Sequence, residues 1–267
     1  MRPDPLRVAA VIAEIAEAEM LPHYRKLSAD AVKTKESPAD LVTIVDEAVE
    51  KALRRRLFEL APGAAFVGEE AAAADPSIAK KIRNEKSCWI VDPLDGTRNF
   101  VNGVDEFGTI VAFVEDGVAT GGWIYAAPLR SMATAVRGEG VTWRGARPKT
   151  RPPAGGKPVG LRSTGWLKPE WRDRLAASLK TSVTSKPGHC SAYAYLKLIE
   201  GDVDFKLSSR IHAWDHAAGA LMLEELGGQA RWLDTRSPYA PQESEDRPLL
   251  ATAPGRSWPD LAGLLVN

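Results

Sequence analysis

The sequence predicts a layered protein of the mixed α/β (α+β) class, and three patterns along the chain lead to this prediction. Residues 5–60 hold two segments in which apolar residues recur at helical spacing. Residues 107–143 alternate in polarity between glycine-containing turns, which is typical of antiparallel strands. Residues 160–233 alternate short strand-like runs with helical segments. This order of elements predicts layers of helices and sheets with short connections.

The helical pattern in the first part of the chain predicts two long helices. The first is expected over residues 5–27 and the second within residues 40–60. Thr43 and Asp46 have the spacing of a capping box, with Asp in place of the usual Glu, so the second helix is expected to begin at this point.

The remaining elements are predicted from shorter runs between turn residues. Strands are expected at residues 64–70, 88–91, 107–127, 131–143, 160–164, 181–185, 203–207 and 229–233. Helices are expected at residues 169–180, 191–201 and 214–228. A stretch rich in Pro, Gly and basic residues, 146–158, predicts a junction between an N-terminal half (1–145) and a C-terminal half (146–267).

The composition disfavours several classes of partner. The 267 residues include 35 Lys and Arg against 35 Asp and Glu, so the formal net charge is zero. Nucleic acids and anionic membrane surfaces attract proteins with a basic excess, so neither is expected as the main partner. The two cysteines, Cys88 and Cys190, have no CxxC spacing, and buried thiols in a reducing compartment are expected.

The N-terminal segment does not have the pattern of a signal peptide, because Glu14, Glu17 and Glu19 interrupt its apolar residues. No segment is long and apolar enough to predict a membrane span. A cytoplasmic protein is therefore expected.

Acidic residues stand where the predicted elements begin or end. Glu70 closes a strand, Asp92 and Asp95 follow another strand, Asp215 opens a helix, and Asp46 lies near the start of a further helix. Ends of this kind can converge on one cleft, which is where α/β sheets usually bind ligands. We therefore expect these carboxylates to share a site.

The chemistry of these residues predicts a site for hard cations and phosphate. Carboxylates and the main-chain carbonyl of Leu94, without thiolates, suit Mg²⁺, Mn²⁺ or Ca²⁺ rather than zinc. Pro93 stiffens the turn after Asp92, and the amides of Gly96 and Thr97 could donate hydrogen bonds to an anion. Carboxylate-bound metal ions beside such donors predict a phosphate-processing site.

Simpler structural roles compete with these interpretations. Asp92 and Asp95 could be turn residues, and Asp215 could cap its helix, a role compatible with metal binding. His212 and His216 are four residues apart, as zinc ligands on a helix can be. Because a helix is expected to begin between them, structural histidines are favoured.

Four blocks of sequence resemble, in order, the motifs of the inositol monophosphatase-like superfamily of magnesium-dependent, lithium-sensitive phosphatases. The blocks are KESPADLVTIVDE (35–47), VGEE (67–70), DPLDGTRNF (92–100) and WDHAAG (214–219). The resemblance extends over residues 5–250 and implies an αβαβα sandwich in which both halves build one catalytic unit. It also implies a homodimer.

The resemblance implies a set of metal ligands. Glu70, Asp92 and the Leu94 carbonyl would bind a first Mg²⁺, and Asp92, Asp95 and Asp215 would bind a second. A third, weaker ion would lie near Glu70, and Mn²⁺ could substitute for Mg²⁺.

The resemblance also implies catalytic and phosphate-binding roles. Thr97, hydrogen-bonded to Asp46, would help Glu70 activate a water molecule that attacks phosphorus directly. The Gly96 and Thr97 amides would bind the phosphate, and Lys35 would lie near the mouth of the site.

The expected substrate is a small phosphorylated metabolite of the inositol phosphate type. Inositol-type members usually carry an acid seven residues before the second-motif Asp, and this chain has Ser208 there. His189, Ser208 and Arg210 are therefore the candidates for substrate contacts. Histidinol phosphate, fructose 1,6-bisphosphate and 3′-phosphoadenosine phosphate remain alternative substrates, and a regulatory, non-catalytic role remains an alternative function.

Overall fold

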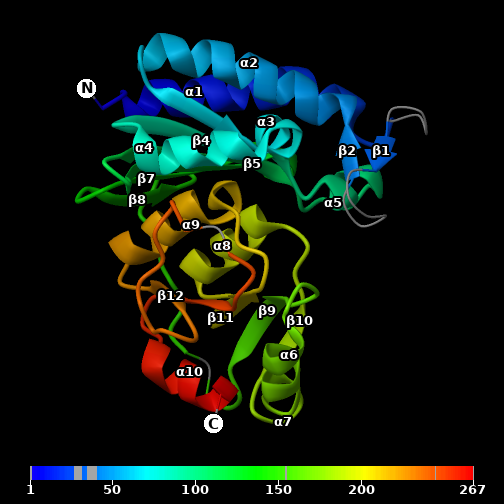
Figure 1. Cartoon of the computed structure of the whole chain (residues 1–267), viewed down its shortest axis with the longest axis vertical. Helices are drawn as coiled ribbons and strands as arrows, with labels where there is room; N and C mark the ends of the chain where they lie inside the picture. The colour runs from blue at the N-terminus through cyan, green and yellow to red at the C-terminus, as the bar shows by residue number, and fades with distance from the viewer. Residues whose placement is uncertain (1, 27–31, 35–40, 154, 244, 267) are drawn as a thin grey trace.

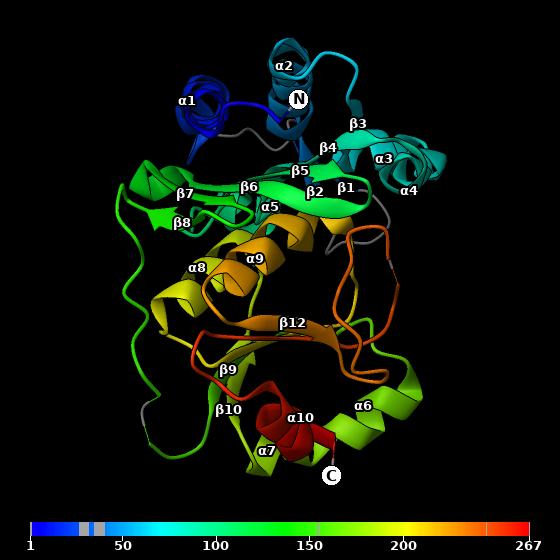
Figure 2. The ribbon, with the colours of Figure 1, turned by 90° about the vertical axis from the view of Figure 1, so that its left-hand side faces the viewer.

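The computed structural model describes residues 2–26, 32–34, 41–153, 155–243 and 245–266, which form alternating layers of helices and sheets (Figures 1 and 2). Two long helices cover the outer face of a six-stranded sheet, two helices lie between this sheet and a five-stranded sheet, and three helices cover the far face. These helices are α1 (Pro5–Ile15) and α2 (Ile44–Leu60), α8 (Ser191–Glu200) and α9 (Ala213–Glu225), and α6 (Pro169–Ala176), α7 (Ser178–Thr181) and α10 (Trp258–Val266). The predicted αβαβα layering is confirmed.

The six-stranded sheet is mostly antiparallel and has the order β3-β4-β5-β6-β7-β8, with only β3 and β4 parallel. Its strands are β3 (Ala65–Gly68), β4 (Ser87–Asp95), β5 (Gly108–Glu115), β6 (Val118–Ala126), β7 (Ser131–Val136) and β8 (Gly140–Trp143). Side chains alternate along β4: Trp89 and Val91 pack in the apolar cluster with α1 and α2, and Cys88 and Ile90 pack with α8 and α9.

The five-stranded sheet has the order β10-β9-β11-β13-β12. Its strands are β9 (Val159–Ser163), β10 (Thr184–Pro187), β11 (Phe205–Ser208), β12 (Gln229–Trp232) and β13 (Leu249–Thr252). Strands β10, β9 and β11 are parallel, and β13 runs antiparallel to both β11 and β12. Phe205 and Leu207 of β11 pack with Leu175, Leu250 and Leu265 in a third apolar cluster, next to α6 and α10.

Short elements complete the described part of the chain. They are η1 (Ala16–Met20), η2 (Leu21–His23), β1 (Val32–Thr34), β2 (Leu41–Thr43), α3 (Glu69–Ala74), η4 (Pro76–Lys80), α4 (Lys81–Asn84), α5 (Thr97–Val101) and η5 (Ala127–Leu129). In these parts of the chain, no helix is both long and apolar enough to pass through a lipid bilayer. The division into halves 1–145 and 146–267 stays a prediction.

Two helix starts follow from local chemistry. Asp4 caps α1 by accepting hydrogen bonds from the amides of Leu6 and Arg7. The capping box predicted for α2 is confirmed, because Asp46 Oδ2 accepts the Thr43 amide at 2.8 Å and Thr43 Oγ1 accepts the Val45 amide at 3.1 Å.

The first helix is shorter than predicted. Regular α-helix ends at Ile15, and a π-helical turn (η1) and a 3₁₀ turn (η2) replace the expected continuation to residue 27. Pro22 donates no amide hydrogen bond, and its ring clashes with the carbonyl four residues earlier, so a regular α-helix cannot continue through this position.

The C-terminal segment contains two elements that were not predicted. Strand β13 and helix α10 follow the strand expected to be the last one. The run that forms β13 has four residues, and a run this short does not distinguish a strand from a buried helix segment or a loop. The strand expected at 181–185 begins later, as β10, because Thr181 ends α7.

Candidate active site

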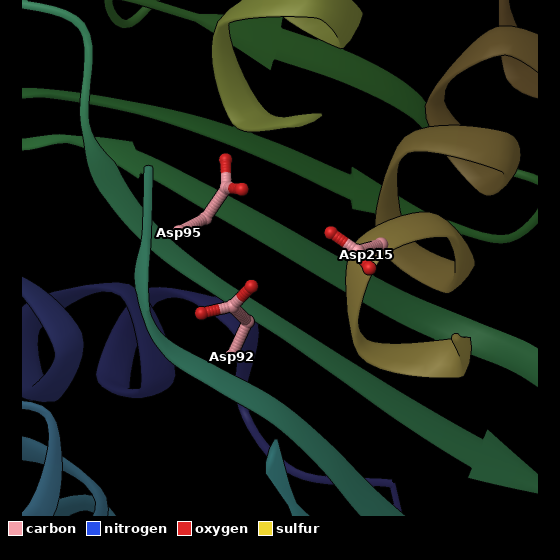
Figure 3. Close-up of side chains that lie close together, drawn as sticks. All are labelled: Asp92, Asp95 and Asp215. Atoms are coloured by element: carbon pink, nitrogen blue, oxygen red, sulfur yellow. The ribbon is translucent and has the colours of Figure 1, made fainter. Parts of the chain in front are cut away.

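Three aspartates from distant parts of the chain lie together between the two sheets. Asp92 and Asp95 come from the end of β4, and Asp215 is the third residue of α9 (Figure 3). Each of them offers a carboxylate oxygen, and these oxygens all lie within 4.8 Å of one another. Asp92 and Asp95 are buried, and Asp215 is partly buried. The structure therefore brings together three of the predicted metal ligands.

The geometry of the β4 end explains why two acids of one strand face the same cleft. Asp92 pairs with Ile110 and Asp95 with Gly108, and the register shifts between these two pairs. Pro93 has no amide hydrogen to contribute to the ladder, and its carbonyl accepts a hydrogen bond from Thr109 Oγ1 at 2.9 Å. The two aspartates were expected after the strand; they lie within it, on either side of this irregularity.

Asp95 is held by the start of α8. Its carboxylate accepts the amides of Ser191 (3.0 Å) and Ala192 (2.6 Å) and the thiol of Cys190 (2.8 Å). Burial and the nearby Asp215 charge raise the pKa of Asp95 to about 6, although these hydrogen bonds oppose the shift. Ser191 Oγ also donates to Asp215 Oδ1 at 3.0 Å, so one helix start positions both carboxylates. Both cysteines are buried free thiols, as predicted.

The surroundings of Asp92 favour a bound cation whenever its carboxyl group is ionised. Its Oδ1 atom is buried and has no hydrogen-bond partner among the described residues. Burial raises the pKa of Asp92 well above its ordinary value, and Glu69, Asp95 and Asp215 raise it further by repulsion. An ionised carboxylate in this position needs a positive partner. An oxygen-only donor set fits Mg²⁺ or Mn²⁺, as predicted from the sequence.

Glu69 lies beside this cluster, and the metal-binding role of Glu70 stays a prediction. Glu69 lines the cleft, and its charge raises the pKa of Asp92. Strand β3 ends at Gly68, so both glutamates belong to the first turn of α3 rather than to the strand end. Successive helical residues point about 100° apart, so the two glutamate side chains leave this turn in different directions.

A buried glutamate that was not predicted fixes this turn. Glu50 of α2 is 7% exposed, and its carboxylate accepts the amides of Glu70 (2.8 Å) and Ala71 (2.9 Å). A Cβ atom at Gly68 would collide with the Glu50 carboxylate, so any other residue at this position would displace that carboxylate. Glu50 thereby anchors the helix start that presents Glu69 to the cleft.

Thr97 and Asp46 form the contact that the family resemblance implies. Thr97 Oγ1 lies 3.1 Å from Asp46 Oδ1 and 2.9 Å from the Leu94 carbonyl oxygen, and its single proton can be donated to either. Asp46 is 1% exposed and also accepts hydrogen bonds from Thr43, so it caps α2 and positions Thr97 at the same time. Its catalytic role stays a prediction.

Gly96 permits a tight turn from β4 into α5. Its φ angle is +84°, and a Cβ atom there would lie 2.9 Å from the Glu106 carbonyl oxygen and 3.2 Å from Cys190 Cβ. Gly96 and Thr97 line the cleft next to the aspartates, together with Leu94. Any side chain at position 96 would therefore disturb the turn that holds the site.

The cleft extends from the aspartates over a basic and aromatic surface and has a volume of about 880 Å³. His189, Ser208 and Arg210, the predicted substrate contacts, all line it. Lys206 lines it as well and was not predicted, because in the sequence it resembles any other polar residue of an alternating strand. Lys35 lies outside the described residues.

The two histidines near Asp215 have structural contacts. His216 is 1% exposed, its Nδ1 lies 2.8 Å from the Tyr195 hydroxyl, and burial lowers its pKa well below the ordinary value. His212 is the N-cap residue of α9, so the i, i+4 helical spacing does not apply, and its ring stacks on Trp214 at 4.6 Å. These contacts favour structural histidines over zinc ligands.

The raised pKa values predict how pH affects the metal-free protein. A carboxyl group whose pKa is raised by folding stabilises the protein below its unfolded pKa, and this contribution is lost as pH rises through the folded pKa. For Asp95 this window runs from about pH 4 to about pH 6, and the loss is on the order of 2 to 3 kcal/mol.

We therefore expect Mg²⁺ to raise the melting temperature more at pH 7.5 than at pH 5, because it binds the ionised carboxylates. Melting curves in EDTA and in Mg²⁺ would measure this difference, with Asp95→Asn as the matched control in which the effect is smaller. An equal response to Mg²⁺ at both pH values would contradict the expectation.

Sequence comparison decides the family. A sequence model described as "Inositol monophosphatase family" matches residues 3–261, nearly the whole chain. The chain belongs to the inositol monophosphatase family. The resemblance inferred from the four blocks of sequence is thus confirmed.

Characterised relatives of this family member are phosphatases. A histidinol-phosphatase from Mycobacterium tuberculosis is 32% identical over 201 residues, which cover 72% of this chain and 74% of that protein. Inositol monophosphatase 1 from Rattus norvegicus is 30% identical over 226 residues, which cover 82% of this chain and 80% of that protein. Both relatives hydrolyse phosphate monoesters, although their names refer to different substrates.

The fold also matches solved structures of the family. The crystal structure of an IMPase/NADP phosphatase complexed with Mg²⁺ and phosphate superposes with a TM-score of 0.78, covering 96% of this chain and 93% of that one. At 19% sequence identity, this likeness shows the fold alone.

Proposed function

We propose that the protein is a magnesium-dependent phosphate monoester hydrolase of the inositol monophosphatase type. The observation that carries this proposal is the convergence of Asp92, Asp95 and Asp215 within 4.8 Å, with Glu69 beside them, in a cleft large enough for a metabolite. These carboxylates and the Leu94 carbonyl would bind two or three Mg²⁺ ions, or Mn²⁺ in their place. When bound, such ions lower the pKa of water and stabilise charge on phosphoryl oxygens.

Thr97 and Asp46 position the attacking water. The Thr97 proton is donated to Asp46 or to the Leu94 carbonyl, so a lone pair of Thr97 Oγ1 remains to accept a hydrogen bond from water. Glu69, next to Asp92, is the carboxylate that we propose as the acceptor of that water's proton, with Glu70 as the alternative. We assign to Glu69 the role that the resemblance gave to Glu70.

The amides of Gly96 and Thr97 are proposed to bind the phosphoryl oxygens. They belong to the turn at the floor of the cleft, directly after Asp95. Amides fixed in such a turn stabilise negative charge without reorganising during the reaction. Because metal ions and amides can neutralise this charge, no covalent enzyme intermediate is required, and water attacks phosphorus directly.

The substrate is proposed to be a small phosphorylated metabolite, bound through the cleft surface that contains His189, Ser208 and Arg210. Hydrolysis of an inositol phosphate is the activity that the sequence motifs favour. Because one relative is a histidinol-phosphatase, histidinol phosphate is an alternative substrate. The homodimer and the cytoplasmic location stay predictions.

Phosphate release tests this proposal. With purified protein and Mg²⁺, we expect release from at least one of inositol 1-phosphate, fructose 1,6-bisphosphate, 3′-phosphoadenosine 5′-phosphate and histidinol phosphate. EDTA should abolish the release, and millimolar Li⁺ should inhibit it, as the family resemblance implies. Activity that persists in EDTA would contradict the metal dependence, and no release from any substrate would favour a regulatory role.

A further inference from the structure

One side of the cleft, next to the predicted metal ligands, is built by strand β11 and the loop after it. Successive strand residues point to opposite faces, and Phe205 and Leu207 enter the apolar cluster below the five-stranded sheet. Lys206 and Ser208 therefore point to the other face, where both line the cleft. Their exposed fractions are 6% and 3%, so this is a built, buried polar surface.

The Lys206 side chain lies close to Asp95 and Asp215. Among the described residues, it donates no hydrogen bond to a carboxylate. Its Nζ donates to Ser191 Oγ at 3.2 Å and lies 5.0 Å from the centre of the Tyr195 ring. Burial lowers the pKa of Lys206 to about 8, although Asp215 and Asp95 oppose the shift. A buried ammonium group is stabilised by an anionic partner. Cations bound to the nearby aspartates would neutralise their charge, so Lys206 would then be available to pair with an anion of the ligand.

Two neighbours extend this surface. The Ser208 hydroxyl is buried and has no hydrogen-bond partner in the described part of the chain, so it can bind a ligand atom. The Arg210 guanidinium lines the cleft and lies over the Trp166 ring, 4.6 Å from its centre, which orients its donors. Lys and Arg side chains donate hydrogen bonds and accept none.

We propose that Lys206, Ser208 and Arg210 form a binding site for an oxyanion, a carboxylate or a second phosphate, on the alcohol part of the substrate. This inference rests on the proposed phosphatase function. A surface of donors requires acceptors on the ligand, and a charged oxyanion offers the most. A neutral polyol is better matched by an acidic side chain, which Ser208 replaces. A cationic alcohol, such as histidinol, would be repelled by Lys206 and Arg210.

Matched substrate pairs test this inference in the full chain with Mg²⁺. The carboxylate arm compares 2-phosphoglycerate with glycerol 2-phosphate, and the phosphate arm compares 3′-phosphoadenosine 5′-phosphate with adenosine 3′-phosphate. Histidinol phosphate is the cationic reference. We expect kcat/KM to be about 10- to 100-fold higher for the anionic member of at least one pair, the range expected for a hydrogen bond to a charged group. The arm that shows this preference identifies the oxyanion.

Substitutions then locate the preference. Lys206→Met should lower the ratio of kcat/KM values within that pair about tenfold, mainly through a higher KM for the anionic member, and Lys206→Arg should restore part of it. Arg210→Gln is the second variant, in case Lys206→Met does not fold. Lys180→Met, on the exposed surface of α7, is the matched control and should leave the ratio unchanged.

Three results would overturn the inference. Equal kcat/KM values within both pairs, or a preference for histidinol phosphate, would exclude the oxyanion site but leave the phosphatase function in place. No phosphate release from any substrate would overturn the proposed function, and this inference with it.

Discussion

The variant Asp92→Asn is expected to lose at least about 1,000-fold in kcat/KM for phosphate release while keeping its fold. Asp92 lies close to Asp95 and Asp215, and the charge of Glu69 also acts on it, so its carboxylate is the one we expect to bind two cations. Asn has nearly the same shape but carries no charge. In EDTA the variant should melt at a higher temperature than the wild type, because repulsion within the cluster is reduced.

Asp116→Asn is the matched control for this variant. Asp116 is exposed in the turn between β5 and β6 and has a φ angle of +49°, a backbone conformation that Asn tolerates. This variant should retain wild-type kcat/KM. Wild-type activity of Asp92→Asn at saturating Mg²⁺ would contradict the assignment of Asp92 as a metal ligand.

Glu69→Gln is expected to lower kcat/KM by about 100- to 1,000-fold, whereas Glu70→Gln should change it by less than about threefold. Glu69 lines the cleft next to Asp92, and the main-chain amide of Glu70 donates a hydrogen bond to Glu50. Both variants are isosteric and differ by one position in the same helical turn. Steady-state phosphate release with Mg²⁺ measures both effects.

The two glutamates serve as controls for each other. A large loss in Glu70→Gln with near-normal activity in Glu69→Gln would restore the role that the sequence motif implied for Glu70. Equal losses in both would show that the turn, rather than one carboxylate, is sensitive to substitution. Circular dichroism in the presence of Mg²⁺ would separate loss of chemistry from loss of structure.

Local patterns predicted much of the fold. The Thr43–Asp46 capping box located the start of α2, and polarity alternation located the antiparallel strands after residue 107. Asp92, Asp95 and Asp215 were predicted as a group because each stands at the end or start of an element. The layers then bring them together, as α9 packs between the two sheets.

The residues that the sequence did not reveal depend on details of packing. Glu69 and Glu70 are identical side chains in succession, and only the helical turn anchored by Glu50 determines which one faces Asp92. Lys206 becomes part of the cleft because Phe205 and Leu207 are committed to the opposite face of β11. These choices are made by contacts between distant segments, which no local pattern contains.

We propose that Glu69, Asp92, Asp95 and Asp215 bind divalent cations at one place, next to the turn at Gly96 and Thr97. Crystals grown with Mn²⁺, measured at a wavelength where manganese scatters anomalously, test it most directly. We expect anomalous peaks within bonding distance of Asp92 and Asp95, with Asp215 also near one peak and Glu69 also near another. Peaks elsewhere on the protein, or none at millimolar Mn²⁺, would contradict it.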